Sequence, residues 1–276
     1  GFLQALAKNA GLELGIYKIR GDNGHHIVES SFKALSRALR NLLDGTNTNE
    51  YKSDAFLEQW GPDSVSHRES IALQRSAMVE RKTKETRIMV KLEFDGGKGG
   101  VSVETGLPTL NELYTAMAKE ANVSLTMECN GDLWIDDHHT SEDVSIALGQ
   151  VLTQAFGTKA GLNRMWCAQA QYGEASVEVV MDLSNRPDLN HNLSISDDEY
   201  VVPGEALTVE MFAHALESLV VNARMTAHIV EKAKGKTVLE TAMAAFVAFG
   251  RALHMCAAVD PRRAGKTASS KGTLSV

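Results

Sequence analysis

Three versions of one short segment recur along this chain, and this repetition constrains the fold more than any single motif. Residues 5–14 (ALAKNAGLEL) return as residues 116–125 (AMAKEANVSL), and a weaker version occupies residues 218–227 (SLVVNARMTA). Each version precedes a short stretch of alternating residues and a turn that contains a glycine. Because repeated sequence specifies a repeated supersecondary element, we expect the same unit three times.

Each unit is predicted to consist of a helix, a strand, a turn and a second helix. The second helices are expected at residues 25–42, 138–155 and 239–253, and in the first of them apolar residues recur every three to five positions. Alternating apolar residues at 90–94 and 177–181 predict strands. Strands that precede helix pairs imply sheet faces covered by helices, so the fold class is α+β with duplicated two-layer units of β-sheet and helix pair.

Composition narrows the functional class. A net charge of −7 argues against a nucleic acid as the main partner. The three scattered cysteines argue against a disulfide scaffold and favour a reducing compartment. No apolar run approaches the roughly 20 residues of a membrane span, so no membrane association is expected.

The two ends of the chain and one internal stretch read as less regular. Residues 1–6 (GFLQAL) resemble the inside of an amphipathic helix without a signal or transit peptide, which suggests that another segment precedes them. We expect a cytoplasmic protein, with a plastid as the alternative. The polar stretch 44–77 reads as a linker with at most one short helix, and residues 261–276 read as a mobile tail.

Two of the three second helices begin with the same His-His-x-x-Glu cassette. Its members are His25, His26 and Glu29 in one copy, and His138, His139 and Glu142 in the other. Residues four apart share a helix face, so the first histidine and the glutamate of each cassette can bind one metal ion. The second histidine points about 100° away and must serve a different ion. Imidazole with carboxylate suits Mn, Fe, Co or Zn.

A single pair of histidines at a helix start is usually a polar cap without a ligand role. Two cassettes with the same spacing, each inside a repeated unit, favour the ligand interpretation. Two facing cassettes would then complete a dinuclear metal centre.

These residues resemble the imidazoleglycerol-phosphate dehydratase family of histidine biosynthesis. The most specific matching segment is 131–143 (GDLWIDDHHTSED), and others are 81–88 (RKTKETRI), 182–187 (DLSNRP) and 269–272 (SSKG). Residues 1–44 resemble instead the second half of the family, through 21–35 (GDNGHHIVESSFKAL). The chain is thus similar to the end of one dehydratase copy followed by a complete second copy.

The resemblance divides the chain into four parts. They are a second-half fragment at 1–44, a linker at 45–78, a dehydratase-like domain at 79–260 with half-units of about 79–160 and 161–260, and a C-terminal tail at 261–276. It also implies the ribosomal protein S5 domain 2-like fold of that family, assembled into a large homo-oligomeric shell.

The implied activity is a hydro-lyase reaction that converts D-erythro-imidazoleglycerol phosphate to imidazole-acetol phosphate. By the resemblance, two Mn²⁺ ions per complete site bind the substrate imidazole between subunits, and Glu85 removes a carbon-bound proton. His228 would join the two cassettes as a metal ligand. The resemblance assigns the phosphate group to basic and hydroxyl side chains, which are Lys33, Arg164, Arg186, Ser269 and Lys271.

Several positions depart from the family pattern. Glu112 replaces a metal-binding histidine, and Trp134 replaces another histidine. The third unit has Leu239 and Met243 where the second cassette belongs, and neither side chain can bind a hard divalent cation. The fragment keeps its cassette but has Gly15 where a histidine is expected.

The losses in the two copies look complementary, which suggests composite sites built from both. The alternatives are a degenerate, non-catalytic scaffold subunit of an oligomeric shell and a simple metal-binding or interaction module. For His214 and His254, both on expected helices, a buried or surface role is expected.

Overall fold

The computed structural model describes residues 1–18, 21–43, 75–95, 100–195, 199–269 and 271–274. The chain divides into two units, Gly1–Ile71 and Ala72–Val276. Residues 44–74, which cover most of the expected linker, lie outside the described residues. Of the polar stretch 44–77 expected as a linker, only residues 75–77 are described, and strand β1 (Ser76–Lys82) already begins among them.

The first unit contains the helices α1 (Phe2–Ala10) and α2 (Gly24–Leu43). The phenyl rings of Phe2 and Phe32 lie 6.0 Å apart between their centroids. The strand expected after the first helix does not form, because residues 12–18 have no regular secondary structure. A strand is stable only with a partner for its ladder of hydrogen bonds, and the described part of this unit offers none.

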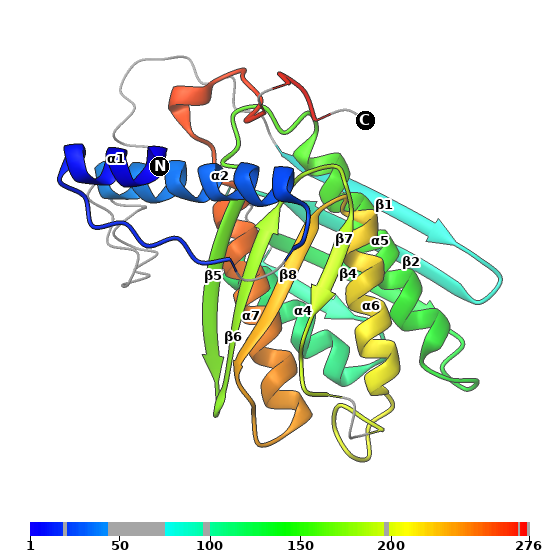
Figure 1. Cartoon of the computed structure of the whole chain (residues 1–276). Helices are drawn as coiled ribbons and strands as arrows, with labels where there is room; N and C mark the ends of the chain where they lie inside the picture. The colour runs from blue at the N-terminus through cyan, green and yellow to red at the C-terminus, as the bar shows by residue number, and fades with distance from the viewer. Residues whose placement is uncertain (19–20, 44–74, 96–99, 196–198, 270, 275–276) are drawn as a thin grey trace. The chain divides into compact units, whose positions relative to one another are not determined.

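The second unit is built from two half-units with the same order of elements (Figure 1). The first contains β1, β2 (Thr86–Glu93), β3 (Val101–Glu104), α4 (Pro108–Glu120), β4 (Ser124–Gly131) and α5 (His138–Phe156). The second contains β5 (Met165–Tyr172), β6 (Ala175–Asp182), β7 (Asp188–His191), α6 (Val209–Asn222), β8 (Thr226–Ala233) and α7 (Val238–Ala257). A short 3₁₀ turn, Pro261–Arg263, follows.

The two sheets have matching topology, with strand orders β1-β2-β4-β3 and β5-β6-β8-β7. In each sheet three strands are antiparallel, and the short edge strand runs parallel to its neighbour. Alternate residues of β2 and β6, such as Val90 and Val177, are fully buried in one continuous core. The α+β class and the duplicated sheet-and-helix units predicted from the repeats are therefore confirmed.

The helices pair across the two half-units. α5 packs on β1 and β2 and runs beside α6, while α7 packs on β5 and β6 and runs beside α4. Glycines allow both close approaches: a Cβ atom at Gly149 would lie against the carbonyl of Leu219, and one at Gly250 would overlap that of Met117. The α5–α6 and α4–α7 crossings are thus equivalent positions of the duplicated fold.

Two expectations are corrected by the second unit. Helix α7 is long and apolar enough to cross a membrane by length and composition, although no such run was expected; 72% of its most apolar window is buried, which marks it as the central core helix. The tail is also not free. The N–H of Gly161 donates to the carbonyl of Lys266 (2.9 Å), and the side-chain amide of Asn185 donates to that of Leu274 (2.9 Å).

Candidate metal centre and phosphate-binding residues

Hydrogen bonds connect the first residues of α5 with the first residues of α6, and they fix the positions of the side chains that could bind a metal ion. The carboxylate of Asp136 accepts the N–H of His138 (3.0 Å) and so helps to begin α5. The carboxylate of Asp137 accepts both the N–H (2.7 Å) and the hydroxyl (2.9 Å) of Thr208. Thr208 is the N-cap of α6, where its hydroxyl accepts the N–H of Met211 (3.2 Å). One aspartate therefore fixes the register between the two helix starts.

Three potential metal ligands converge at this point. Glu142 Oε1 lies 3.2 Å from His214 Nε2, and Glu142 Oε2 lies 3.7 Å from His138 Nε2. One ligand atom from each side chain lies within 4.8 Å of the other two. The side chains are about one third to one half exposed, so the group opens to one side. We refer to His138, Glu142 and His214 as the triad.

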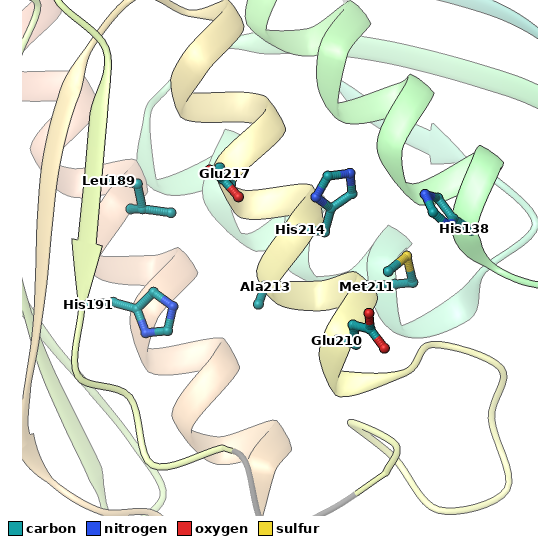
Figure 2. A pocket seen from close by; sticks show the side chains of 8 residues that line it. All are labelled: His138, Leu189, His191, Glu210, Met211, Ala213, His214 and Glu217. Atoms are coloured by element: carbon teal, nitrogen blue, oxygen red, sulfur yellow. The ribbon is translucent and has the colours of Figure 1, made fainter.

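Two members of the triad, His138 and His214, line an open hollow between α6 and the edge strand β7 (Figure 2). Figure 2 shows the imidazoles of His138 and His214 on neighbouring helices, with His191 of β7 across the hollow. Two imidazoles and a carboxylate with an open side match a catalytic divalent cation better than a closed structural zinc site.

A buried or surface role is expected for His214; the side chain is partly exposed and lies within the triad. The sequence did carry a signal for it. When residues 218–227 are set against 116–125, His214 occupies the position of Glu112, where the family resemblance implies a metal-binding histidine. The alignment of the two repeats therefore indicates that the second half-unit keeps a histidine, His214, at the position where the first half-unit has Glu112.

The second histidine of the cassette faces a different direction, as the helix geometry predicts. Nδ1 of His139 lies 3.0 Å from Oδ2 of the buried Asp132. This hydrogen bond raises the pKa of His139, and the charge of Glu85 adds to the effect. The other oxygen of Asp132, Oδ1, is buried and has no protein partner among the described residues. His139 is thereby oriented with its Nε2 available.

The predicted proton acceptor Glu85 lies in the turn between β1 and β2. Asp143, one residue beyond the cassette, holds this turn: its carboxylate accepts hydrogen bonds from Arg81 (2.6 and 2.9 Å) and from the hydroxyl of Thr86 (2.5 Å). The hydroxyl of Thr83 accepts the N–H of Glu85 (3.2 Å). Glu85 is exposed and close enough to His139 to affect its pKa.

The other proposed ligands are placed differently. His228 lies on β8 opposite Val180 of β6 and Asn190 of β7, and it belongs to no metal-binding group of three within the described residues. In the first unit, His25 Nε2 lies 3.7 Å from Glu29 Oε2, the same separation as in the other cassette. His26 is exposed at the start of α2.

The altered cassette on α7 has taken a structural role. Its Glu240 carboxylate accepts the N–H groups of Lys236 (2.8 Å) and Glu174 (3.2 Å), and these bonds lower its pKa. Met243 is buried, and Glu112 on α4 is exposed. Among the residues described, the α4–α7 crossing therefore contains no counterpart of the triad.

Some of the proposed phosphate ligands are bound to carboxylates of the same chain, and others are exposed to solvent. Arg164 is 3% exposed: Nε and Nη2 bind Asp182 (2.7 and 2.9 Å), and Nη1 donates to the carbonyl of Ala268 (2.6 Å). The exposed Arg186 and Lys271 remain open to solvent, and the hydroxyl of Ser269 accepts the N–H of Lys271 (3.2 Å). In the first unit, Lys33 forms an ion pair with Glu29 (2.8 Å).

The matching sheets and paired helices define a duplicated α+β protein with a cluster of histidine and carboxylate side chains at one helix crossing. The family model for imidazoleglycerol-phosphate dehydratase matches residues 1–39 and 105–253. The chain therefore belongs to the imidazoleglycerol-phosphate dehydratase family, whose members are lyases of histidine biosynthesis.

Individual relatives agree with this assignment. The imidazoleglycerol-phosphate dehydratase of Gloeobacter violaceus is 40% identical over 200 residues, which cover 72% of this chain and 98% of that protein. The Neisseria gonorrhoeae enzyme is 39% identical over 210 residues, or 76% and 67% of the two chains. Crystal structures of the dehydratases from Staphylococcus aureus and Pyrococcus furiosus superpose with TM-scores of 0.58 and 0.59, at 29% and 28% identity. They cover 67% and 71% of this chain and 99% of their own.

Proposed function

We propose that this chain dehydrates D-erythro-imidazoleglycerol phosphate to imidazole-acetol phosphate, and that the triad binds a Mn²⁺ ion for this reaction. The observation that carries the proposal is the convergence of His138, Glu142 and His214 from two helices, in a chain of the dehydratase family. Two imidazoles and one carboxylate form a donor set that Mn²⁺ accepts, with room for further ligands. A bound divalent cation lowers the pKa of the substrate imidazole and stabilises negative charge on its ring.

Glu85 is the proposed base. Its carboxylate takes the proton from the second carbon of the side chain, and the hydroxyl group on the carbon attached to the ring leaves, so that the reaction releases one water molecule. The enol that remains becomes the ketone of imidazole-acetol phosphate. Asp143 supports this role because it holds the hairpin turn of Glu85 against the helix of the cassette. His139, oriented by Asp132, is the proposed ligand of the second Mn²⁺ ion.

We further propose that a complete site needs more than one chain or copy. The triad lies at the start of α5, while the loop of Arg186 is bound to Lys159, just beyond its end. A helix of 19 residues is about 28 Å long. A substrate with one imidazole ring, a three-carbon chain and one phosphate is much shorter. One chain's metal site and phosphate-binding residues therefore serve different substrate molecules in a homo-oligomeric shell.

The cassette of the first unit fits the same scheme. His25 and Glu29 repeat the separation seen between His138 and Glu142. We propose that His25, His26 and Glu29 supply to a composite dinuclear site the ligands that Leu239 and Met243 no longer offer.

A second function is supported by the altered α4–α7 crossing. At this crossing Glu240 caps a turn and Met243 is buried, so neither is free to bind a metal ion. This favours a scaffold subunit that keeps the fold of the family but does not catalyse the reaction. The two functions differ in measurable ways.

The deciding experiment incubates the full chain with imidazoleglycerol phosphate and Mn²⁺ and follows the imidazole-acetol phosphate product. Bound manganese is measured on the same samples for the wild type, for His214→Asn and for the control Glu104→Gln, at an exposed strand residue. We expect product from the wild type, loss of both product and manganese in His214→Asn, and little change in Glu104→Gln. Manganese binding without product supports the scaffold function. Unchanged manganese in His214→Asn would refute the triad as the metal site.

A further inference from the structure

Unusual backbone conformations gather around the loop at residues 183–186, which lies between β6 and β7 of the second half-unit. Among the described residues that are not glycine, six have positive φ, and four of these belong to this loop and its neighbours: Lys159 (60°), Arg164 (72°), Asn185 (59°) and Arg224 (53°). Two of them are joined by a backbone hydrogen bond, since Asn185 N donates to Arg224 O (2.9 Å). Left-handed backbone at non-glycine residues persists only where the surroundings hold it, and it concentrates at functional sites.

The ammonium group of Lys159 is at the centre of this cluster. It donates to the side-chain carbonyl of Asn185 (2.6 Å) and to the main-chain carbonyls of Leu183 (3.3 Å) and Arg224 (3.5 Å). The residue is only 2% exposed, and its Nζ lies 5.7 Å from the ring centroid of Phe156. The three donors of a lysine thus meet three neutral oxygens from three positions in the sequence.

The loop that Lys159 binds carries Arg186 and contacts the tail. The main-chain carbonyl of Arg186 accepts the hydroxyls of Ser184 (2.9 Å) and Thr226 (2.8 Å). The side-chain amide of Asn185 donates to the carbonyl of Leu274 (2.9 Å), at the end of the segment that contains Ser269 and Lys271. Asn185 therefore connects the buried ammonium group of Lys159 both to the loop that carries Arg186 and to the tail that carries Ser269 and Lys271.

The surroundings of the loop are rich in positive charge. Burial, together with the charges of Arg224 and Arg164, lowers the pKa of Lys159 to about 8, although Asp182 opposes this shift. Both carboxylate oxygens of Asp182 are already bound by Arg164. The exposed guanidinium groups of Arg186 and Arg224 have no carboxylate partner in the described part of the chain. Such a surface attracts anions.

We propose that Lys159 is a positioning residue for substrate phosphate: it holds the 183–186 loop and, through Asn185, the tail, so that Arg186 and Lys271 are placed to bind the anion. The inference rests on the proposed function, because the dehydratase substrate supplies the phosphate group. Lys159 is too buried to touch the phosphate. Its effect passes through the residues that it holds.

The test measures the binding of inorganic phosphate to the full chain by titration calorimetry, which needs no turnover. Lys159→Met removes the ammonium at similar length, and Lys159→Arg keeps the positive charge and donors. Asn185→Gly tolerates the positive φ but breaks the link between Lys159 and Leu274. The matched control is Lys236→Met, at an exposed lysine that pairs with Glu174. Thermal unfolding and manganese binding at the triad are measured on every variant.

We expect Lys159→Met and Asn185→Gly to weaken phosphate binding on the order of tenfold or more, because small displacements of anchoring groups have large effects. Lys159→Arg should recover most of the affinity, and manganese binding and Lys236→Met should match the wild type. In an active enzyme, Lys159→Met should raise KM far more than it lowers kcat. Phosphate affinity unchanged in Lys159→Met, or a wild type that binds no phosphate, would overturn the proposal. Phosphate binding that depends on Lys159 in a protein without dehydratase activity would refute only the proposed function.

Discussion

Nδ1 of His139 lies 3.0 Å from Oδ2 of Asp132, and this contact orients the second imidazole of the cassette away from the triad. Asp132 is buried and directly follows β4, while His139 is partly exposed at the start of α5. The pair resembles the carboxylate–histidine arrangement that fixes a metal ligand's tautomer and raises its basicity.

Asp132→Asn should therefore weaken manganese binding while the fold remains intact. Loss of such an outer carboxylate usually reduces metal affinity or activity by about 10- to 100-fold. We would measure manganese affinity at fixed pH, with Asp188→Asn on the edge strand β7 as a control. An affinity equal to that of the wild type would show that His139 does not bind the metal.

Asp143→Ala should destabilise the protein and reduce activity together. The carboxylate is nearly buried and accepts charged hydrogen bonds from Arg81 as well as the hydroxyl of Thr86. Removing it leaves the guanidinium unpaired and should cost about 2–3 kcal/mol of unfolding free energy. Activity should fall further than stability alone explains, because the turn that carries Glu85 loses its anchor. Denaturant unfolding and turnover rates check both effects, and full activity in a destabilised variant would argue against Glu85 as the base.

Gly149→Ala should separate α5 from α6 and disturb the triad. An added Cβ would lie 2.6 Å from Cβ of Asn222 and 2.7 Å from the carbonyl of Leu219. Overpacking of this kind costs about 1–3 kcal/mol. Gln150→Ala, at the next position of the same helix, is the control. We expect lower thermal stability and weaker manganese binding in the glycine variant only; a variant with normal stability would mean that the two helices tolerate the extra atom.

The repeats and the cassettes were enough to predict the fold class and much of the site, but not all contacts. The second helices expected at 25–42, 138–155 and 239–253 correspond to α2, α5 and α7. His214 was missed because its helix has no His-His motif of its own, and only the register between α4 and α6 reveals it. The role of Lys159 cannot be predicted from sequence, since its three acceptors come from separate segments. Likewise, hydrogen bonds from Gly161, Arg164 and Asn185 hold a tail whose composition suggested mobility.

The carboxylate of Glu240 should make stability depend on pH on the acidic side. Its hydrogen bonds from the N–H groups of Lys236 and Glu174 lower its pKa below the ordinary value of 4.5. A carboxyl group whose pKa is lowered by folding stabilises the folded protein above pH 4.5, and this contribution is lost as the pH falls through the lowered value. Melting temperatures measured from pH 7 to about pH 3 should therefore drop less steeply for Glu240→Gln than for the wild type. Glu104→Gln, at an exposed strand residue, should retain the wild-type slope.

Restoring the altered cassette should create a second metal site in the same domain. The α4–α7 crossing is equivalent to the α5–α6 crossing, and Glu112, Leu239 and Met243 occupy the positions of His214, His138 and Glu142. The triple variant E112H/L239H/M243E would place the same three ligands at the equivalent crossing. Because Met243 is buried, the new carboxylate should destabilise the metal-free protein, and added manganese should reverse much of that loss. We expect the bound manganese per chain to rise by one equivalent relative to the wild type. The double variant E112H/L239H, which lacks the carboxylate, serves as the control, and an unchanged metal content in the triple variant would show that the two crossings are not functionally equivalent.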